Sequence, residues 1–407
     1  MKMKNTLKAL LCFVLAVSME SLAFGQTFGY SITDNDQDVT GYTQQLYRIR
    51  LADGETKYLG DMVLDRNLDG VIDLSVAAVT GERVQREYEG LASIGSTLYA
   101  VPEFANLAGV GQLCNTNQDP ITGLSVDLRI IKYHGPVQTT PDPVNPHPAP
   151  VPASVSTQVP GFNSVVGPQV GETCIAFGTE SALGYNAIDG FLYSIASDDL
   201  IPLPNVRSQL NRIDPTTGLA VATFNITNPA CAAGCTPTHG SGDPLPYLDG
   251  LTILPNGIAY GTEVRFDQDP LQGDPSDPDP NQNGGGLYRI SLTGATAGQA
   301  TFVKYLLPNR LGRDTGLANN SAGQLFILNE RGQIYKTDGA PGSPVSLNTF
   351  LHTTGATSGA TGLDGRRIAG CRGVEGADEF DQVGPGVGTC GDFEGFDAPL
   401  VNLPTLP

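Results

Sequence analysis

A repeated pattern of apolar and polar positions divides most of the chain into similar segments. Glu89-Gly90-Leu91, Asp249-Gly250-Leu251 and Thr315-Gly316-Leu317 each begin a short apolar run, and Leu183-Gly184-Tyr185 begins a fourth. A glycine-containing turn and a second aliphatic or aromatic run follow in each copy, which predicts a β-hairpin. The predicted second strands are 98–101, 191–195, 258–260 and 325–328.

Two more strands are expected after each hairpin. The third strands have a pattern such as Leu-Tyr-Arg-Ile, and the fourth are short apolar or alternating runs. We place the third strands at 128–131, 210–213, 287–290 and 333–336, and the fourth at 174–177, 220–224, 301–305 and 345–347. Four antiparallel strands in each copy of a long repeat are typical of a β-propeller blade.

The two ends of the chain predict how such a propeller closes. Segments 28–32, 46–49 and 57–59 match the second, third and fourth strands of a blade, and no first strand precedes them. Residues 361–368 could provide that strand, which would protect exposed sheet edges. The sequence therefore predicts an all-β fold, a β-propeller of five blades closed by a blade shared between the N- and C-terminal strands. If the tail at 393–396 forms a blade strand of its own, the propeller has six blades. A different all-β arrangement, such as a β-sandwich, is the alternative to a propeller.

The N-terminal residues predict export. Lys2, Lys4 and Lys8 precede or flank an apolar run, and small residues follow up to Gly25, a pattern typical of a signal peptide over 1–25. No later stretch reaches the roughly 20 apolar residues of a membrane span. We expect a secreted, periplasmic or cell-surface protein with no transmembrane segment. Its expected parts are a propeller at 26–370, with a proline-rich insertion at 136–160 and an acidic loop at 265–285, and a disulfide-restrained tail at 371–407.

The charge and composition of the chain narrow the classes of molecule that it is expected to bind. The formal net charge of -19 repels phosphate backbones, and no basic patch with interleaved aromatic residues is present, so nucleic acid is not an expected partner. The 50 glycines and 30 prolines fit a chain of many short strands and turns.

Six cysteines follow the predicted signal peptide, and an oxidising compartment makes disulfides the expected state. Their clustering favours Cys231 with Cys235, Cys371 with Cys390, and Cys114 with Cys174, although other pairings stay open. A zinc site is less well supported, because no second cysteine pair or spaced histidines accompany the Cys231 and Cys235 pair.

One segment has the spacing of a calcium loop. Oxygen ligands fall at Asp65, Asn67, Asp69 and Asp73, with the backbone of Val71 between them. The nine residues resemble the loops of dockerins and EF-hands, but Val76 stands at the twelfth position where those loops have an acidic ligand. The sequence predicts calcium here, structural or catalytic, and an ordinary Asn/Asp-rich turn is the alternative.

Further acids fall at corresponding ends of the predicted strands. Glu89 and Asp249 lie near starts of first strands, and Glu103, Glu263 and Glu330 end second strands. These ends share one face of an up-and-down blade, so the carboxylates could gather around the channel mouth and bind calcium. In the alternative interpretation they cap strands, pair with arginines or face water.

Four segments resemble parts of known protein families. Residues 46–49, 184–193 and 213–218 resemble those of secreted bacterial β-propeller proteins, a largely uncharacterised group, and 89–103 is more faintly similar to phytase-like and esterase-like propellers. The resemblance implies a scaffold and does not imply a particular chemistry.

The sequence contains no Gly-x-Ser-x-Gly elbow, His-Glu-x-x-His helix or phosphate-binding Gly-x-x-x-x-Gly-Lys loop. Catalytic residues are therefore not assigned. The favoured function is a calcium-stabilised extracellular binding or surface-associated scaffold for a glycan, matrix or protein ligand. The alternative is a calcium-dependent hydrolase of phosphoesters, esters or glycosides at the channel mouth. The pattern leaves the oligomeric state open.

Overall fold

The computed structural model describes residues 28–33, 45–51, 56–64, 88–102, 129–133, 163–169, 180–197, 208–231, 245–263, 286–306, 315–329, 333–340, 350–353 and 393–399. These ranges contain β-strands and two short 3-10 helices, η1 (Pro229–Cys231) and η3 (Gly294–Thr296). The all-β prediction is confirmed. Within the same ranges, no helix has the length and apolar character to cross a membrane.

Three sheets each contain four antiparallel strands, and sequence neighbours pair with one another. One sheet consists of β8 (Glu180–Asn186), β9 (Phe191–Ser197), β10 (Ser208–Ile213) and β11 (Ala220–Asn225). The next consists of β12 (Leu248–Ile253), β13 (Ala259–Glu263), β14 (Gly286–Ile290) and β15 (Ala300–Tyr305). The third consists of β16 (Thr315–Asn319), β17 (Gln324–Asn329), β18 (Gln333–Asp338) and β19 (Phe350–Thr353).

A fourth sheet has eight strands in the order β20-β1-β2-β3-β7-β6-β5-β4. One half consists of β20 (Phe393–Asp397), β1 (Phe28–Thr33), β2 (Gln45–Arg50) and β3 (Thr56–Leu64). The other half consists of β4 (Tyr88–Ile94), β5 (Thr97–Pro102), β6 (Arg129–Tyr133) and β7 (Asn163–Gln169). The pairs within each half are antiparallel, and β3 and β7 join the halves by a parallel pairing. The sheet thus contains two four-stranded arrays, and the first of them combines both ends of the chain.

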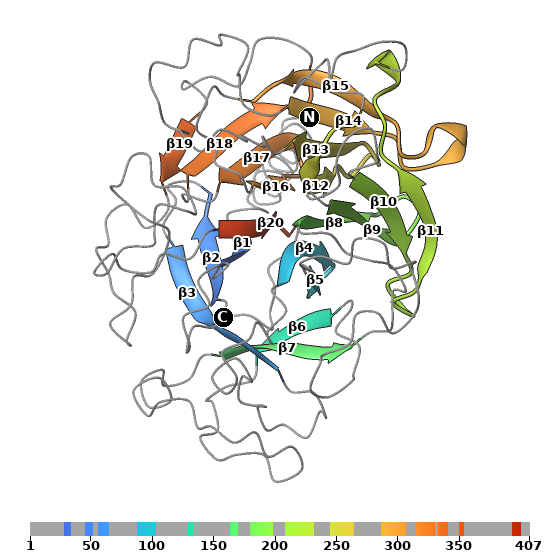
Figure 1. Cartoon of the computed structure of the whole chain (residues 1–407). Helices are drawn as coiled ribbons and strands as arrows, with labels where there is room; N and C mark the ends of the chain where they lie inside the picture. The colour runs from blue at the N-terminus through green and yellow to red at the C-terminus, as the bar shows by residue number, and fades with distance from the viewer. Residues whose placement is uncertain are drawn as a thin grey trace, which may run out of the picture.

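The first strand of each array lies toward the middle of the molecule, while the fourth strands β3, β7, β11, β15 and β19 lie outside (Figure 1). We call β4, β8, β12, β16 and β20 the inner strands. They contact one another in that order, and β20 also contacts β4. The contacts between inner strands are made by side chains and backbone packing, since none of these pairs is hydrogen-bonded as sheet neighbours.

One apolar residue near the middle of each inner strand connects neighbouring arrays. It is nearly inaccessible in every inner strand, and each copy packs in a different apolar cluster. The cluster around Leu91 includes residues of β1 and β2, and the cluster around Phe396 includes residues of β2, β17 and β18. Burying such side chains stabilises the fold by roughly 1.5–3 kcal/mol each. The five residues are Leu91, Leu183, Leu251, Leu317 and Phe396.

The glycine of the motif allows the inner strands to approach closely. A Cβ atom on Gly90 would lie 2.8 Å from the carbonyl carbon of Ala182 in β8. A Cβ atom on Gly316 would lie 2.8 Å from the backbone nitrogen of Phe396 in β20. Both separations are shorter than real Cβ contacts, so any larger residue would push two backbones apart.

All four predicted hairpins are confirmed. The pairs β4 with β5, β8 with β9, β12 with β13, and β16 with β17 are antiparallel neighbours. The turn glycines predicted from sequence have left-handed backbones, as at Gly190 (φ 78°) and Gly257 (φ 80°). The predicted third strands and the N-terminal strands also correspond to β6, β10, β14, β18 and to β1, β2, β3.

Three strand predictions were wrong. The fourth strand beside β6 is β7, and the fourth strand beside β18 is β19, whereas the sequence predicted 174–177 and 345–347. The strand beside β1 is β20, whereas the sequence predicted 361–368. Those three predicted segments lie outside the described residues. Short apolar runs fit several pairing partners equally well, so the tertiary contacts decide which run joins the sheet.

The position of β20 depends on the side chain of Phe396. Phe396 is 3% exposed and its ring covers Gly29 of β1, while its backbone lies against Gly316 of β16. We expect Phe396→Ala to lower the free energy of unfolding by roughly 3–5 kcal/mol, because it leaves a cavity where two arrays meet. Urea unfolding of the purified protein measures the change.

A suitable control is Ile188→Ala, since Ile188 is 69% exposed in the turn between β8 and β9. Its effect should stay within about 0.5 kcal/mol. Equal, small effects of the two substitutions would contradict the role of Phe396 in holding β20.

Candidate functional site

A cavity of about 260 Å³ opens where the C-terminal halves of the inner strands converge. Every inner strand contributes to its wall: Ser93 from β4, Tyr185 from β8, Ile253 from β12, Asn319 from β16 and Asp397 from β20. The volume is slightly below the roughly 300 Å³ at which drug-sized pockets begin, so it suits a small ligand. The cavity is therefore the part of the described structure to which all five arrays contribute.

Asp397 is the acidic group of this wall. The hydroxyl and amide of Ser93 and the amide of Ala398 hydrogen-bond to its carboxyl group. Oδ2 is nevertheless buried and has no hydrogen-bond partner among the described residues. Burial raises the pKa of Asp397 to about 7, and the bonds from Ser93 and Ala398 oppose that rise only in part. A carboxyl group with such a pKa in a cavity is typical of functional sites.

The other titratable groups near Asp397 belong to β1 and β2. Tyr30 is the register partner of Asp397 and is 4% exposed. Burial raises the pKa of the Tyr30 hydroxyl, Asp397 raises it further, and Arg48 lowers it. The Arg48 guanidinium lies 4.5 Å from the centre of the Phe28 ring. The carboxyl group of Asp397 thus lies near a phenol whose own pKa is raised, and Arg48 is close enough to that phenol to lower its pKa.

The opposite wall is fixed by hydrogen bonds between β16 and β12. Asn319 Nδ2 donates to Thr252 Oγ1 at 2.7 Å and to the Ile253 carbonyl oxygen at 3.1 Å. Thr252 and Ile253 both line the cavity. These bonds hold two inner strands at a fixed distance, so the cavity is preformed on this side.

Glu89 and Asp249, two of the acids predicted at the channel mouth, lie at the N-terminal ends of the inner strands, away from the cavity. There they link neighbouring inner strands. Glu89 Oε2 accepts a hydrogen bond from the Ser181 amide of β8. In the same way, Asp249 Oδ2 accepts from the Thr315 amide of β16, and the Thr315 hydroxyl donates to it at 3.2 Å. Glu89 is 1% exposed and Asp249 is 3% exposed. Each carboxylate therefore satisfies a buried backbone amide of the next inner strand.

Glu263 plays a similar part inside one sheet. It is 3% exposed at the end of β13, and its Oε2 accepts from the Gly286 amide at 2.9 Å and from the Tyr288 hydroxyl at 3.4 Å. The remaining predicted mouth acids, Glu103 and Glu330, lie outside the described residues. In the described ranges, no three His, Cys, Asp or Glu side chains come together as metal ligands.

The predicted calcium loop and most of the cysteines also lie outside the described residues. Asp65, Asn67, Asp69, Val71 and Asp73 fall between the end of β3 and the start of β4. Cys231 is buried in η1, with Asn228 Nδ2 at 3.6 Å from its sulfur atom. The calcium site and the disulfide pairings stay predictions.

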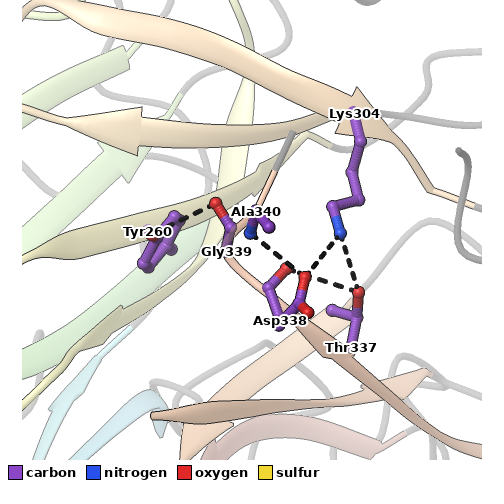
Figure 2. Close-up of polar contacts among 6 residues, drawn as sticks. All are labelled: Tyr260, Lys304, Thr337, Asp338, Gly339 and Ala340. Atoms are coloured by element: carbon purple, nitrogen blue, oxygen red, sulfur yellow. Dashed lines mark hydrogen bonds and ion pairs between the residues drawn. The ribbon is translucent and has the colours of Figure 1, made fainter. Parts of the chain in front are cut away.

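A second polar cluster connects two sheets at the periphery. Figure 2 shows the Lys304 side chain of β15 reaching Asp338 and Thr337 of β18, with Nζ 3.1 Å from Asp338 Oδ1 and 3.3 Å from Thr337 Oγ1. The ammonium group lowers the pKa of Asp338. The Tyr260 hydroxyl donates to the Gly339 carbonyl oxygen at 3.4 Å in the same region. All these groups have partners in the neighbouring sheet, so the cluster is structural.

A third polar cluster lies within the sheet of β8 to β11. The Tyr193 hydroxyl donates to Asp189 Oδ2 at 2.6 Å, and Arg212 Nη2 lies 3.6 Å from the same oxygen. The Arg212 guanidinium also lies 3.6 Å from the centre of the Phe191 ring. Burial and the bond to Asp189 raise the pKa of Tyr193. These contacts hold the hairpin of β8 and β9 against β10.

Comparison with known proteins identifies no family. No family model matches the chain, and no curated protein matches it either. Among solved structures, a protein of unknown function from Bacteroides thetaiotaomicron is 12% identical with a TM-score of 0.33, over 74% of this chain and 53% of that one. A protein of unknown function from Bacteroides caccae is 6% identical with a TM-score of 0.31, over 82% and 76%.

A GH43 protein from Bacillus licheniformis is 11% identical with a TM-score of 0.33, over 77% of this chain and 48% of that one. The chain thus spans about half the length of the first of these structures. Because all three TM-scores lie below 0.5, the likenesses decide neither the fold nor the function.

Reasoning from sequence did not single out Asp397. A signal was nevertheless present, because Glu394-Gly395-Phe396 repeats the spacing of Glu89-Gly90-Leu91 and Asp249-Gly250-Leu251. That match places Asp397 one residue after the buried apolar position, next to the cavity end of an inner strand.

The raised pKa of Asp397 predicts a pH-dependent stability. An ordinary aspartate has a pKa near 3.9, so the folded protein favours the protonated form of Asp397. The resulting stabilisation is complete below about pH 4 and is lost as the pH rises through about 7. We expect Asp397→Asn, which cannot ionise, to become progressively more stable relative to the natural protein from about pH 4 to about pH 7, and the difference to level off above that pH.

Urea unfolding at several pH values measures this difference. Asp338→Asn is the control: Lys304 lowers the pKa of Asp338, so this group stays ionised in the folded and the unfolded protein above about pH 5, and its substitution should give a difference that does not depend on pH there. If the natural protein and Asp397→Asn have parallel pH profiles, Asp397 is not a buried neutral acid.

Proposed function

We propose that the chain is an exported five-bladed β-propeller that binds a small ligand in its central cavity, as an extracellular binding or surface-associated protein. The five blades are the four-stranded arrays that begin with the inner strands. β20 and β1 complete the blade shared between the two ends. Calcium bound at the loop between β3 and β4 stabilises the assembly.

The blade count and the closure are supported by the contacts of the inner strands. β20 pairs with β1 on one side and packs against β4 and β16 on the others. Five apolar clusters each lie between two consecutive arrays. A ring of arrays with an apolar layer at each junction is the way a propeller buries both faces of its blades.

The cavity is the observation that carries the binding function. It lies where strands from all five arrays meet, it combines aliphatic walls with Ser93, Asn319 and Asp397, and it contains a carboxyl group with a perturbed pKa. A concave, mostly apolar site with a few converging polar groups is the usual form of a small-molecule site. Its position on the rigid inner strands favours binding without rearrangement.

The hydrolase alternative receives less support. The described carboxylates Glu89, Asp249 and Glu263 are engaged with backbone amides, as is expected of structural acids. Among the described residues of the cavity wall there is no Lys, Arg or His that could neutralise a phosphoester. A catalytic calcium site would therefore need ligands from the predicted loop at Asp65 and from Glu103 or Glu330.

Binding of small molecules tests the proposed function directly. A panel of neutral, cationic and anionic molecules of monosaccharide size or smaller, including glucose, is screened by saturation-transfer NMR against the full protein. We expect at least one charge class to bind the natural protein and to lose binding in Ala187→Phe. Ala187 is an exposed residue of the cavity rim, so the larger ring blocks the entrance without disturbing the core.

The melting temperature of Ala187→Phe should equal that of the natural protein, which shows that the variant is folded. Absence of binding in all three charge classes, or binding that Ala187→Phe leaves intact, would reject the cavity as the ligand site.

Calcium titration tests the structural part of the proposal. We expect stoichiometric binding by calorimetry and a melting temperature that falls in chelator, because a ligand that binds only the folded state stabilises it. Asp69→Ala should remove both effects, since Asp69 is the central oxygen ligand of the predicted loop. Asp338→Ala, outside the loop, should preserve them. No binding at millimolar calcium would refute the loop assignment.

A further inference from the structure

The charges around the cavity decide which ligand it can accept. Among the described residues that line the cavity, Asp397 is the acidic one and none carries a cationic side chain. An anionic ligand would have to enter a partly apolar site opposite a carboxyl group, without a compensating cation. Cationic and neutral ligands are the classes that fit this wall.

We propose that the central cavity binds a small organic ammonium ion with an apolar body, and that Asp397 is its counter-ion. This inference rests on the proposed function, because it names the ligand class of the same cavity. The ammonium group donates to the carboxyl group of Asp397, and the hydrocarbon part occupies the aliphatic side of the cavity.

The carboxyl group explains why a cation is preferred to a neutral alcohol. One of its oxygens lacks a hydrogen-bond donor in the described structure, and burial makes an isolated negative charge costly there. An ammonium ion supplies both a donor and the opposite charge, whereas a hydroxyl group supplies only a donor. Charge-assisted hydrogen bonds are roughly twice as strong as neutral ones.

A metal ion fits the wall less well than an organic cation does. Calcium takes six to eight oxygen ligands, and the described residues contain no group of three His, Cys, Asp or Glu side chains. The rest of the wall is largely hydrocarbon, with the lining residues Leu183, Leu251 and Leu254 at 2%, 3% and 8% exposure. These side chains can bury the apolar body of an ammonium ligand and gain about 25 cal/mol for each Å² removed from water.

Two further features favour a cation. Tyr185 brings an aromatic side chain to the same wall, and aromatic rings attract ammonium groups through their negative faces. The formal net charge of -19 attracts cations from solution and speeds their encounter with the protein.

Calorimetric titration of the full protein with three molecules of similar shape tests the inference. The probes are butylammonium, 1-butanol and butyrate, at pH 8.5, which is above the pKa of about 7 that burial gives Asp397. We expect butylammonium to bind at least tenfold more tightly than 1-butanol, and butyrate not to bind.

Three variants locate the site. Asp397→Asn should weaken butylammonium binding at least tenfold and leave 1-butanol unchanged, because it keeps the shape and removes the charge. Ala187→Phe should abolish binding of both. Asp338→Asn is the matched control: it removes an acidic charge outside the cavity and should leave the affinity unchanged.

Equal affinity for butylammonium and 1-butanol, or full affinity in Asp397→Asn, would overturn the inference. Binding of 1-butanol or butyrate, or of glucose from the NMR panel, without binding of butylammonium would also overturn it while leaving the proposed function in place. If Asp397→Asn does not fold, the comparison of the three probes in the natural protein and in Ala187→Phe still decides the outcome. No binding by any of the three probes would overturn the inference, and only absence of binding across the whole panel would reject the proposed function as well.

Discussion

The close approach of neighbouring inner strands is the constraint on which the rest of the structure depends. These strands are not paired as sheet neighbours, so nothing in the β-ladders fixes the distance between them. Three successive residues of the motif do so instead. The acid accepts an amide from the next inner strand, the glycine removes the Cβ atom that would collide with it, and the leucine fills the apolar layer between arrays, as at Glu89, Gly90 and Leu91.

The same constraint gives the acids of the motif their role. Water cannot reach the Ser181 and Thr315 amides at the packed centre, and an unsatisfied buried amide costs about 1–3 kcal/mol. Glu89 and Asp249 offset that cost with charge-assisted bonds. The two ends of the inner strands therefore differ in character: carboxylates are used for structure at the N-terminal end, and Asp397 stands beside a cavity at the C-terminal end.

The strand from the C-terminal region links stability and function. β20 brings Phe396 into the apolar layer between two arrays, and the next residue, Asp397, reaches the cavity wall. Packing around Phe396 holds the carboxyl group of Asp397 in a buried place where it ionises less readily than it would in water. In the proposed site, a carboxyl group held in this way binds a ligand of the opposite charge, so the strand that pairs with β1 and packs against β4 and β16 also supplies a polar group of the cavity wall.

The sequence by itself determined the local elements. Residue alternation and turn glycines such as Gly190 and Gly257 predicted the hairpins, because strand period and turn conformation depend on neighbours in the chain. The Glu-Gly-Leu pattern was also visible, yet its acids were interpreted as a possible metal cluster, and the pattern at Glu394-Gly395-Phe396 was not recognised as a first strand. Only the tertiary structure decided that Phe393–Asp397 lies beside β1, that Glu89 and Asp249 bind amides of other strands, and that Asp397 faces a shared cavity wall. The reason is physical: pairing, burial and pKa depend on partners far away in the chain, and a local pattern does not specify which partner a strand or a carboxylate will meet.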